Sequence, residues 1–235
     1  LPVDQLIGRL DDLLQTDVDD IANFIESLLE QGALYSTYYE DILYIYPPEM
    51  YVSEVEGVHY TREFLLEADP IALDISSFIE KFERDNYIIF GDAQKEAIQL
   101  SFFEKFSLIT GGPGTGKTTI IKALVKGFQL GGLGRIILCA PTGRAAKRLT
   151  EATEFEATTI HRLLVPVQKE AHVIIVGDVD QLPPIGAGFV LKDLLDSDCV
   201  PYTRLNQIYR QSSGNTIVES AYAINRGEMP NLEGV

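Results

Sequence analysis

One segment restricts the fold of this chain more than any other, the glycine-rich run GGPGTGKTT at residues 111–119. An apolar, strand-like run, FSLIT, stands before it, and a helix-like run, IIKALVKGF, follows it. The spacing of Gly111, Gly116, Lys117 and Thr118 fits G-x-x-x-x-G-K-[ST], the pattern of a phosphate-binding loop that joins a strand to a helix. The sequence therefore predicts an α/β fold with a phosphate site at the carboxyl end of this strand.

The residues of this loop have the chemistry that a nucleotide phosphate and its metal ion require. Glycines let the backbone wrap around phosphate oxygens, so that successive N–H groups form a nest for an anion. Lys117 supplies a positive charge to the β- and γ-phosphates, Thr118 offers its hydroxyl to Mg²⁺, and the following helix presents its positive end. The predicted nucleotide site comprises Gly112, Pro113, Gly114, Thr115, Gly116, Lys117, Thr118 and Thr119, with Thr118 as the metal ligand.

A phosphate-binding loop alone does not distinguish a kinase, a GTPase, a transporter subunit and a helicase. The chain contains no N-K-x-D motif for reading guanine, which disfavours a GTPase. We therefore expect ATP and Mg²⁺ as the ligands of the loop.

The sequence after residue 85 alternates short apolar runs with helix-like segments. FSLIT precedes GGPGTGKTT, RIILCA precedes PTGRAAKRL, and HVIIVGD precedes VDQLPPIG. This βαβα order is typical of a parallel sheet with helices on both faces. We place this α/β domain at residues 85–203.

The first 84 residues have a different pattern. TDVDDIANFIESLLEQGAL, from Thr16, reads as a capped helix with an apolar face, and the tyrosine-rich run ALYSTYYEDILYIY after the Gly32 break favours a β-hairpin. More helical sequence follows Pro47-Pro48. We predict a small α-rich, winged-helix-like domain over residues 1–84. Packing against its neighbour and binding a partner or DNA remain alternative roles for this domain.

The net charge of −16 argues against a generic nucleic-acid binder, because such proteins usually present a basic surface to phosphates. Much of the acid lies before residue 100, however, whereas Arg144, Lys147, Arg148 and Arg162 cluster later. This asymmetry permits a local basic track on an acidic protein.

Two further features concern the compartment. Cys139 and Cys199 show no metal-ligand spacing, so we interpret both as free thiols in a reducing environment. No apolar stretch approaches the roughly 18 residues of a membrane span, and the first residues have no signal-like pattern. A cytoplasmic protein without a membrane partner is the expectation.

Five segments, in this order, carry a resemblance to a known family. They are DAQKEAI (92–98), GGPGTGKTT (111–119), APTGRAAKRL (140–149), GDVDQLPPIGAG (177–188) and LNQIYRQSSGNTI (205–217). With them the chain resembles the RecD-like branch of superfamily-one DNA helicases, which are similar to the exodeoxyribonuclease V alpha subunit. The resemblance implies a P-loop NTPase (RecA-like) motor domain over 85–203 and the start of a second, incomplete one over 204–235.

The same resemblance implies an activity and partners. It indicates an ATP-dependent 5′-to-3′ DNA helicase or translocase that acts in DNA recombination or double-strand-break repair. Single-stranded DNA or DNA with a 5′ overhang is the implied substrate, and RecBCD-type subunits are candidate partners. A nucleotide-binding scaffold with a degenerate motor and a conjugation helicase linked to a relaxase are the alternatives.

The resemblance also assigns roles to individual residues. Gln94 is similar to the family's adenine-binding glutamine, and an amide can both donate to and accept from the adenine edge. Gln181 resembles the glutamine that touches the γ-phosphate, and Arg210 resembles an arginine brought to that phosphate from the second motor domain. Such an arginine finger is worth roughly 10³ to 10⁵ in rate. The predicted catalytic residues are therefore Lys117, Gln181 and Arg210.

A second group of residues is expected at the DNA. Thr142, Gly143 and Arg144 follow a strand and open a helix, so that a hydroxyl, backbone N–H groups and a guanidinium can face a phosphate. His161 lies in TTIHRLL, which is similar to a family segment near the DNA. The alternatives are a helix cap with a solvated arginine and a structural histidine.

One family feature is missing from the sequence. The family has a strand that ends in Asp-Glu between APTGRAAKRL and GDVDQLPP, where Asp holds Mg²⁺ through water and Glu activates the attacking water. Here HRLLVPV runs through QKE directly into AHVIIVGD. Our hypothesis is that a segment of a longer protein is omitted between Leu164 and Glu170, with Asp178 as a weaker candidate for the metal carboxylate. In either case the fragment by itself is expected to be inactive.

Overall fold

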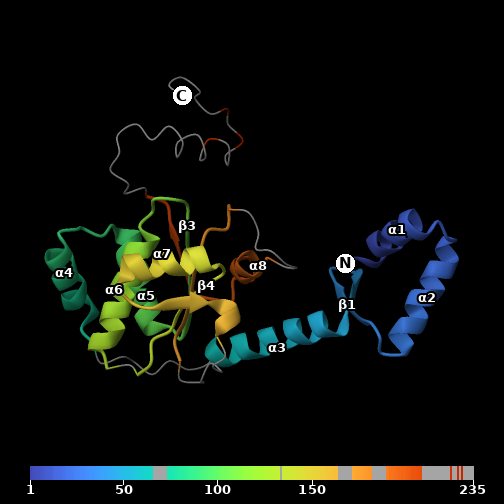
Figure 1. Ribbon diagram of the computed structural model, residues 1–235, viewed down its shortest axis with the longest axis horizontal. Helices are drawn as coiled ribbons and strands as arrows, with labels where there is room; N and C mark the ends of the chain where they lie inside the picture. The colour runs from blue at the N-terminus through green and yellow to red at the C-terminus, as the bar shows by residue number, and fades with distance from the viewer. Residues whose placement is uncertain are drawn as a thin grey trace. The chain divides into compact units, whose positions relative to one another are not determined.

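The computed structural model describes residues 1–65, 73–132, 134–163, 171–181 and 189–207, together with the single positions 223, 227 and 229 (Figure 1). The chain divides into two compact units, Leu1–Glu63 and Phe64–Val235. No helix among the described residues is long and apolar enough to cross a membrane.

The first unit combines helices with one hairpin. Its elements are α1 (Val3–Leu14), α2 (Val18–Glu30), β1 (Tyr35–Tyr39), β2 (Ile42–Tyr46) and the greater part of α3 (Pro48–Leu65). The carboxylate of Asp17 caps α2 by accepting a hydrogen bond from the Asp19 N–H at 2.9 Å. Ile21 and Ile25 of α2 are buried in one cluster with Ile45 of β2. The expected helix and hairpin are both present, while the likeness to a winged helix stays a prediction.

The second unit is built on a parallel sheet. The strand β3 (Phe106–Gly111) lies between β6 (Val173–Gly177) and β7 (Tyr202–Leu205), and both neighbours run parallel to it. A separate parallel pair consists of β4 (Leu138–Ala140) and β5 (Ala157–Thr159). The expected α/β fold of the P-loop type is confirmed.

Helices cover both faces of this sheet. Successive residues of β3 point to opposite faces, and Ile109 packs in one apolar cluster while Leu108 packs in another. The first cluster includes α4 (Ile75–Asn86), α5 (Asp92–Phe103) and α6 (Lys117–Leu130). The second includes Leu195 of α8 (Val190–Asp196). All six residues of β3 are buried, so the strand that leads into the glycine-rich loop is fixed from both sides.

The helix α4 lies in the second unit, although we expected the boundary between domains after residue 84. Its apolar face explains the difference, because Phe78 and Phe82 join the aromatic core of the second unit. The ring centroids of Phe78 and Phe102 are 6.1 Å apart, and those of Phe82 and Phe90 are 5.7 Å apart. The unit boundary therefore falls between residues 63 and 64.

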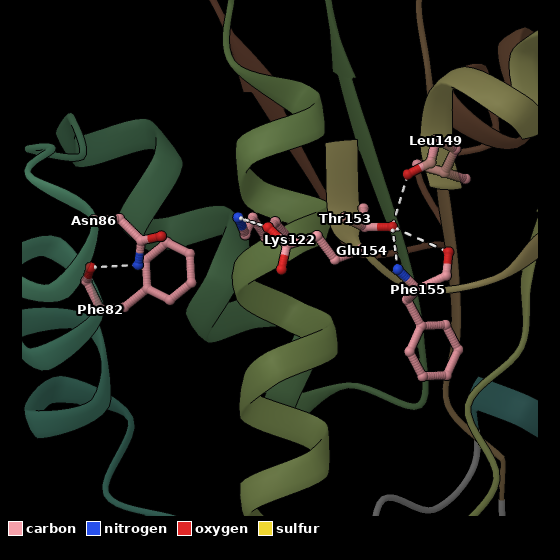
Figure 2. A network of polar contacts seen from close by, with 7 residues as sticks. All are labelled: Phe82, Asn86, Lys122, Leu149, Thr153, Glu154 and Phe155. Atoms are coloured by element: carbon pink, nitrogen blue, oxygen red, sulfur yellow. Dashed lines mark hydrogen bonds and ion pairs between the residues drawn. The ribbon is translucent and has the colours of Figure 1, made fainter. Parts of the chain in front are cut away.

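The helix α7 (Gly143–Thr153) connects the β4–β5 pair with α6. Figure 2 shows the Lys122 ammonium of α6 at 3.0 Å from the carboxylate of Glu154, which ends α7. The Thr153 hydroxyl donates to the Leu149 carbonyl at 2.7 Å and accepts from the Phe155 N–H at 3.3 Å. These contacts fix the turn that leads from α7 into β5.

Candidate functional site

The glycine-rich loop joins β3 to α6 and is held in a curled conformation. Gly114 has φ +82° and Gly116 has φ +86°, a region that residues with a side chain rarely adopt. The hydroxyl of the buried Thr115 donates to the Gly112 carbonyl at 2.9 Å. A Cβ atom on Gly111 would lie 2.8 Å from the Leu205 carbonyl oxygen. Close packing therefore fixes the shape of this loop, as the sequence pattern predicts.

The Lys117 ammonium folds back over this loop. Its Nζ atom donates to the carbonyl oxygens of Gly111 and Gly112, the latter at 2.8 Å. Burial lowers the pKa of Lys117 below its ordinary value, and the negative charge of Asp178 opposes this shift. The cation therefore lies beside the loop and the amino end of α6, where an anion would be attracted.

Gln94 is buried beneath the loop. Its Nε2 donates to the Thr115 carbonyl at 2.9 Å, and its Oε1 accepts from the Gly91 N–H at 3.0 Å. The side chain is 4% exposed. Contact between Gln94 and adenine stays a prediction, and both ends of its amide are engaged with the protein.

Asp178 and Gln181 follow β6 at the same end of the sheet. The Gln181 amide donates to Asp178 Oδ2 at 2.7 Å, and Asp178 Oδ1 accepts from the Asp180 N–H at 3.2 Å. The charge of Asp178 acts on Lys117, so these side chains share one electrostatic environment. The γ-phosphate role of Gln181 stays a prediction, and Arg210 lies outside the described residues.

A metal ion has few protein ligands at this site. In the described part of the chain, no group of three or more His, Cys, Asp or Glu side chains is arranged to hold one. Thr118 is exposed in the first turn of α6. Because Mg²⁺ often binds proteins through few side chains plus substrate phosphates, the exposed Thr118 hydroxyl fits Mg²⁺ that arrives with a nucleotide.

The strand β6 contrasts with its neighbour β3. All five of its residues are half-buried, and within the described residues it pairs with β3 alone. The pair β4–β5 forms a separate sheet. The hypothesis of an omitted segment concerns residues 164–170, which lie outside the described residues.

A second candidate site lies where α7 begins and β5 ends. It is a pocket of about 410 Å³ lined by Gly143, Ala146, Lys147, Glu156, Ala157, Thr158, Thr159 and Arg162. Arg162 belongs to a short 3₁₀ helix, Ile160–Arg162, that follows β5. The pocket therefore combines the amino end of α7 with two cationic side chains.

The four predicted DNA residues differ in their position relative to this pocket. Gly143 lines it, while Arg144 and His161 are exposed and directly adjoin lining residues in sequence. The Thr142 hydroxyl caps α7 by accepting from the Ala145 N–H at 3.2 Å, which is the helix-cap alternative. Lys147 and Arg162 were named in the sequence only as part of a possible basic track, and the structure places both in the lining of this pocket.

The chain is similar to several named proteins. Two family models, each described as an AAA domain, match residues 94–170 and 165–234. The ATP-dependent RecD2 DNA helicase of Deinococcus radiodurans is 36% identical over 160 residues, which are 52% of this chain and 22% of that protein. The RecBCD enzyme subunit RecD of Mycobacterium tuberculosis is 32% identical over 199 residues, 58% of this chain and 35% of that protein. The ATP-dependent DNA helicase dda of phage T4 is 45% identical over 69 residues, 28% of this chain and 16% of that protein.

The two longer matches extend further in the relatives than in this chain. The match with the D. radiodurans protein covers 160 residues, whereas 52% of a 235-residue chain is about 122 residues, about 38 fewer. The match with the M. tuberculosis protein covers 199 residues. Because 58% of this 235-residue chain is about 136 residues, the difference is about 63 residues. The relatives therefore have residues within the matched region that have no counterpart in this chain.

The chain spans between about a fifth and a third of the length of these two relatives. The first AAA-domain match, residues 94–170, includes the phosphate-binding loop, and such a domain is consistent with the parallel sheet. The chain matches AAA-domain models over residues 94–170 and 165–234, and it is similar to RecD-like helicases over part of their length.

Proposed function

We propose that the protein containing this chain is an ATP-dependent 5′-to-3′ DNA helicase or translocase of the RecD-like type. The observation that carries the proposal is the curled loop between β3 and α6, with Lys117 folded over it. An AAA-domain model matches residues 94–170, which include this loop, and relatives named as ATP-dependent DNA helicases are similar to part of the chain. Recombination or double-strand-break repair is the proposed role, because other relatives are named as subunits of RecBCD.

In this proposal the loop binds the phosphates of ATP. Lys117 exchanges the carbonyl oxygens of Gly111 and Gly112 for phosphate oxygens, and the amino end of α6 adds its partial positive charge. The Thr118 hydroxyl would hold Mg²⁺, and the ion would neutralise charge on the phosphates. Gln181 leaves Asp178 for the γ-phosphate, and Arg210 approaches the same phosphate from the second motor domain.

DNA binding is proposed at the pocket between α7 and β5. Lys147, Arg162 and Arg144 supply positive charge there, and Gly143 and His161 lie at its border. The charge of −16 does not oppose this placement, because residues 1–63 hold 14 acidic and 2 basic residues, whereas residues 64–235 hold 21 and 17. Single-stranded DNA or a 5′ overhang is the proposed substrate, RecBCD-type subunits are proposed partners, and the cytoplasm is the proposed location.

The groups that activate water are proposed to lie in the omitted segment. A strand beside the half-buried β6 would bring its last residues to the end of the sheet where Asp178 and Lys117 lie. Asp178 remains the weaker candidate for the metal carboxylate. The fragment by itself is therefore expected to hydrolyse little ATP.

Lys117→Ala in the full-length protein tests the proposal. We expect DNA-stimulated ATP hydrolysis to fall about 100-fold or more, since Lys117 is the proposed electrostatic partner of the transferred phosphate. Lys122→Ala on the same helix, which removes an ion pair with the exposed Glu154, is the matched control and should retain turnover. Retained hydrolysis in Lys117→Ala with an intact fold contradicts the proposal.

The same assay separates the alternatives. ATP binding without DNA-stimulated hydrolysis in the full-length wild-type protein would favour the nucleotide-binding scaffold. A relaxase domain in the flanking sequence would favour the conjugation helicase.

A further inference from the structure

The β-hairpin of the first unit has one face that packs on helices and one face made largely of tyrosines. Leu43 and Ile45 of β2 pack in the apolar cluster with α1 and α2, so these two positions face inward. Because side chains alternate along a strand, the even-numbered positions of β2 face outward, as do the β1 residues paired with them. With one residue of α3, this outward side forms the tyrosine face: Tyr35, Tyr39, Tyr44, Tyr46 and Tyr51.

The rings of the tyrosine face hold one another in place. The rings of Tyr35 and Tyr51 are stacked, with centroids 4.9 Å apart and planes inclined by 10°. Tyr51 also meets the Tyr46 ring edge-on at 6.0 Å, and the rings of Tyr39 and Tyr44 meet edge-on at 6.4 Å. Tyr39 is nevertheless 64% exposed. The hairpin therefore presents an ordered aromatic surface to the solvent.

Carboxylates lie at both ends of this face. The hairpin turn consists of Glu40 and Asp41, which are exposed, directly follow Tyr39 and have φ values of +48° and +61°. At the other end, Glu54 of α3 lies beside the Tyr46 hydroxyl. Burial raises the pKa of Tyr46 above its ordinary value, and the negative charge of Glu54 raises it further. The surface is thus aromatic in its middle and negatively charged at its ends.

We propose that the tyrosine face binds an arginine- or lysine-bearing segment of a partner protein. Cations are attracted to the faces of aromatic rings and to carboxylates beside them. The whole unit favours such a partner, because residues 1–63 hold 14 acidic and 2 basic residues, a net charge of −12. Single-stranded nucleic acid also stacks on aromatic rings, but it would bring its phosphates to the same carboxylates and is therefore disfavoured. The inference does not depend on the phosphate-binding loop, which lies in the other unit.

A substitution at Tyr39 tests the role of the rings. Fluorescence anisotropy measures binding of a labelled octapeptide of alternating arginine and serine to the full-length protein at low salt. For Tyr39→Thr we expect binding to be about fivefold weaker, because one exposed ring is lost while threonine keeps a strong preference for strands. Tyr39→Phe retains the ring and should bind within about twofold of wild type.

Tyr38→Thr is the matched control. Tyr38 is 73% exposed and adjoins Tyr39 in β1, but it is paired with the inward-facing Leu43 and so points to the opposite face. This variant should bind the peptide like wild type. Glu40→Asn/Asp41→Gly removes both carboxylates of the turn and introduces the residues that a two-residue turn with positive φ prefers. We expect it to keep the hairpin and to bind about threefold weaker at low salt, with the difference shrinking as salt rises.

Four outcomes would overturn the inference. Equal losses in Tyr38→Thr and Tyr39→Thr would show attraction to the overall negative charge alone. Unchanged peptide binding in a folded Tyr39→Thr protein would remove the tyrosine face from binding. Binding of octathymidylate that is lost in Tyr39→Thr and kept in Tyr38→Thr would make the face a nucleic-acid surface. Thermal denaturation checks the fold of each variant, and if Tyr39→Thr unfolds, unchanged peptide affinity of Glu40→Asn/Asp41→Gly at low salt contradicts the inference.

Discussion

The phosphate-binding loop and the pocket beside α7 both lie at the amino end of a helix, yet they are built differently. In the loop, Cβ atoms on Gly111 and Gly116 would lie within 2.8 Å and 2.3 Å of neighbouring atoms. In the pocket, a Cβ atom on Gly143 would meet nothing within 4 Å. The loop thus depends on backbone groups fixed by packing, whereas the pocket depends on exposed side chains such as Lys147 and Arg162. The first site should be sensitive to shape and the second to charge.

The largest effect is expected for Gly116→Ala in the phosphate-binding loop. Gly116→Ala places a methyl group against Gln94 at a backbone φ of +86°, so we expect a loss of about 1–3 kcal/mol in the free energy of unfolding. Affinity for Mg²⁺-ATP should fall about 100-fold or more, since the loop can no longer keep its shape. Thermal denaturation and calorimetric titration measure the two effects.

Gly143→Ala is the counterpart in the pocket. Because open space surrounds Gly143, this variant should bind ATP like wild type and be no less stable. If Gly116→Ala and Gly143→Ala changed ATP affinity and stability equally, the two sites would not differ in their dependence on backbone shape.

Removal of the two cationic side chains of the pocket should have an effect of intermediate size, and only DNA binding should change. In the double variant Lys147→Ala/Arg162→Ala, we expect weaker binding of single-stranded DNA and a salt dependence of log K that is shallower by about 1.4, or 0.7 for each lost phosphate contact. Titration of labelled DNA at several salt concentrations measures both quantities. ATP affinity should remain unchanged.

The matched control for charge is Lys81→Ala/Lys192→Ala, which removes two exposed cations outside the pocket. If this control lowers DNA affinity and the salt slope equally, net charge rather than the pocket determines binding.

The smallest expected effect concerns the cap of α7. Thr142→Ala removes the hydroxyl that accepts from the Ala145 N–H, and should lower the free energy of unfolding by about 1 kcal/mol. DNA affinity should change less than about twofold, because the hydroxyl is already used by the helix. Chemical denaturation measures the first quantity, and Thr142→Ser should restore stability. A large loss of DNA affinity in a stable Thr142→Ala protein would instead make Thr142 a DNA ligand.

Local patterns account for what was predicted correctly. The strand, loop and helix around Lys117 are consecutive in the sequence, so their spacing specifies the phosphate loop before any tertiary contact is known. The alternation of apolar runs and helical segments likewise indicated a parallel sheet, because a connection through a helix joins parallel strands. The cap of α2 and the tyrosine-rich hairpin followed from short-range rules as well.

Features that depend on distant contacts were not predictable in this way. The helix α4 lies near the first unit in sequence, but Phe78 and Phe82 find their apolar partners in α5 and α6. Lys147 and Arg162 belong to different elements, and the fold of α7 against β5 brings both to one pocket.

The sequence by itself determined the class of the fold, the identity of the phosphate-binding loop and the resemblance to the RecD-like helicases, because each depends on contiguous motifs and their order. The tertiary structure decided which backbone groups form hydrogen bonds with the Gln94 amide, which unit contains α4 and which cations line one pocket. Those features depend on contacts between residues far apart in the chain, which only the packing of α5, α6 and α7 around the sheet brings together.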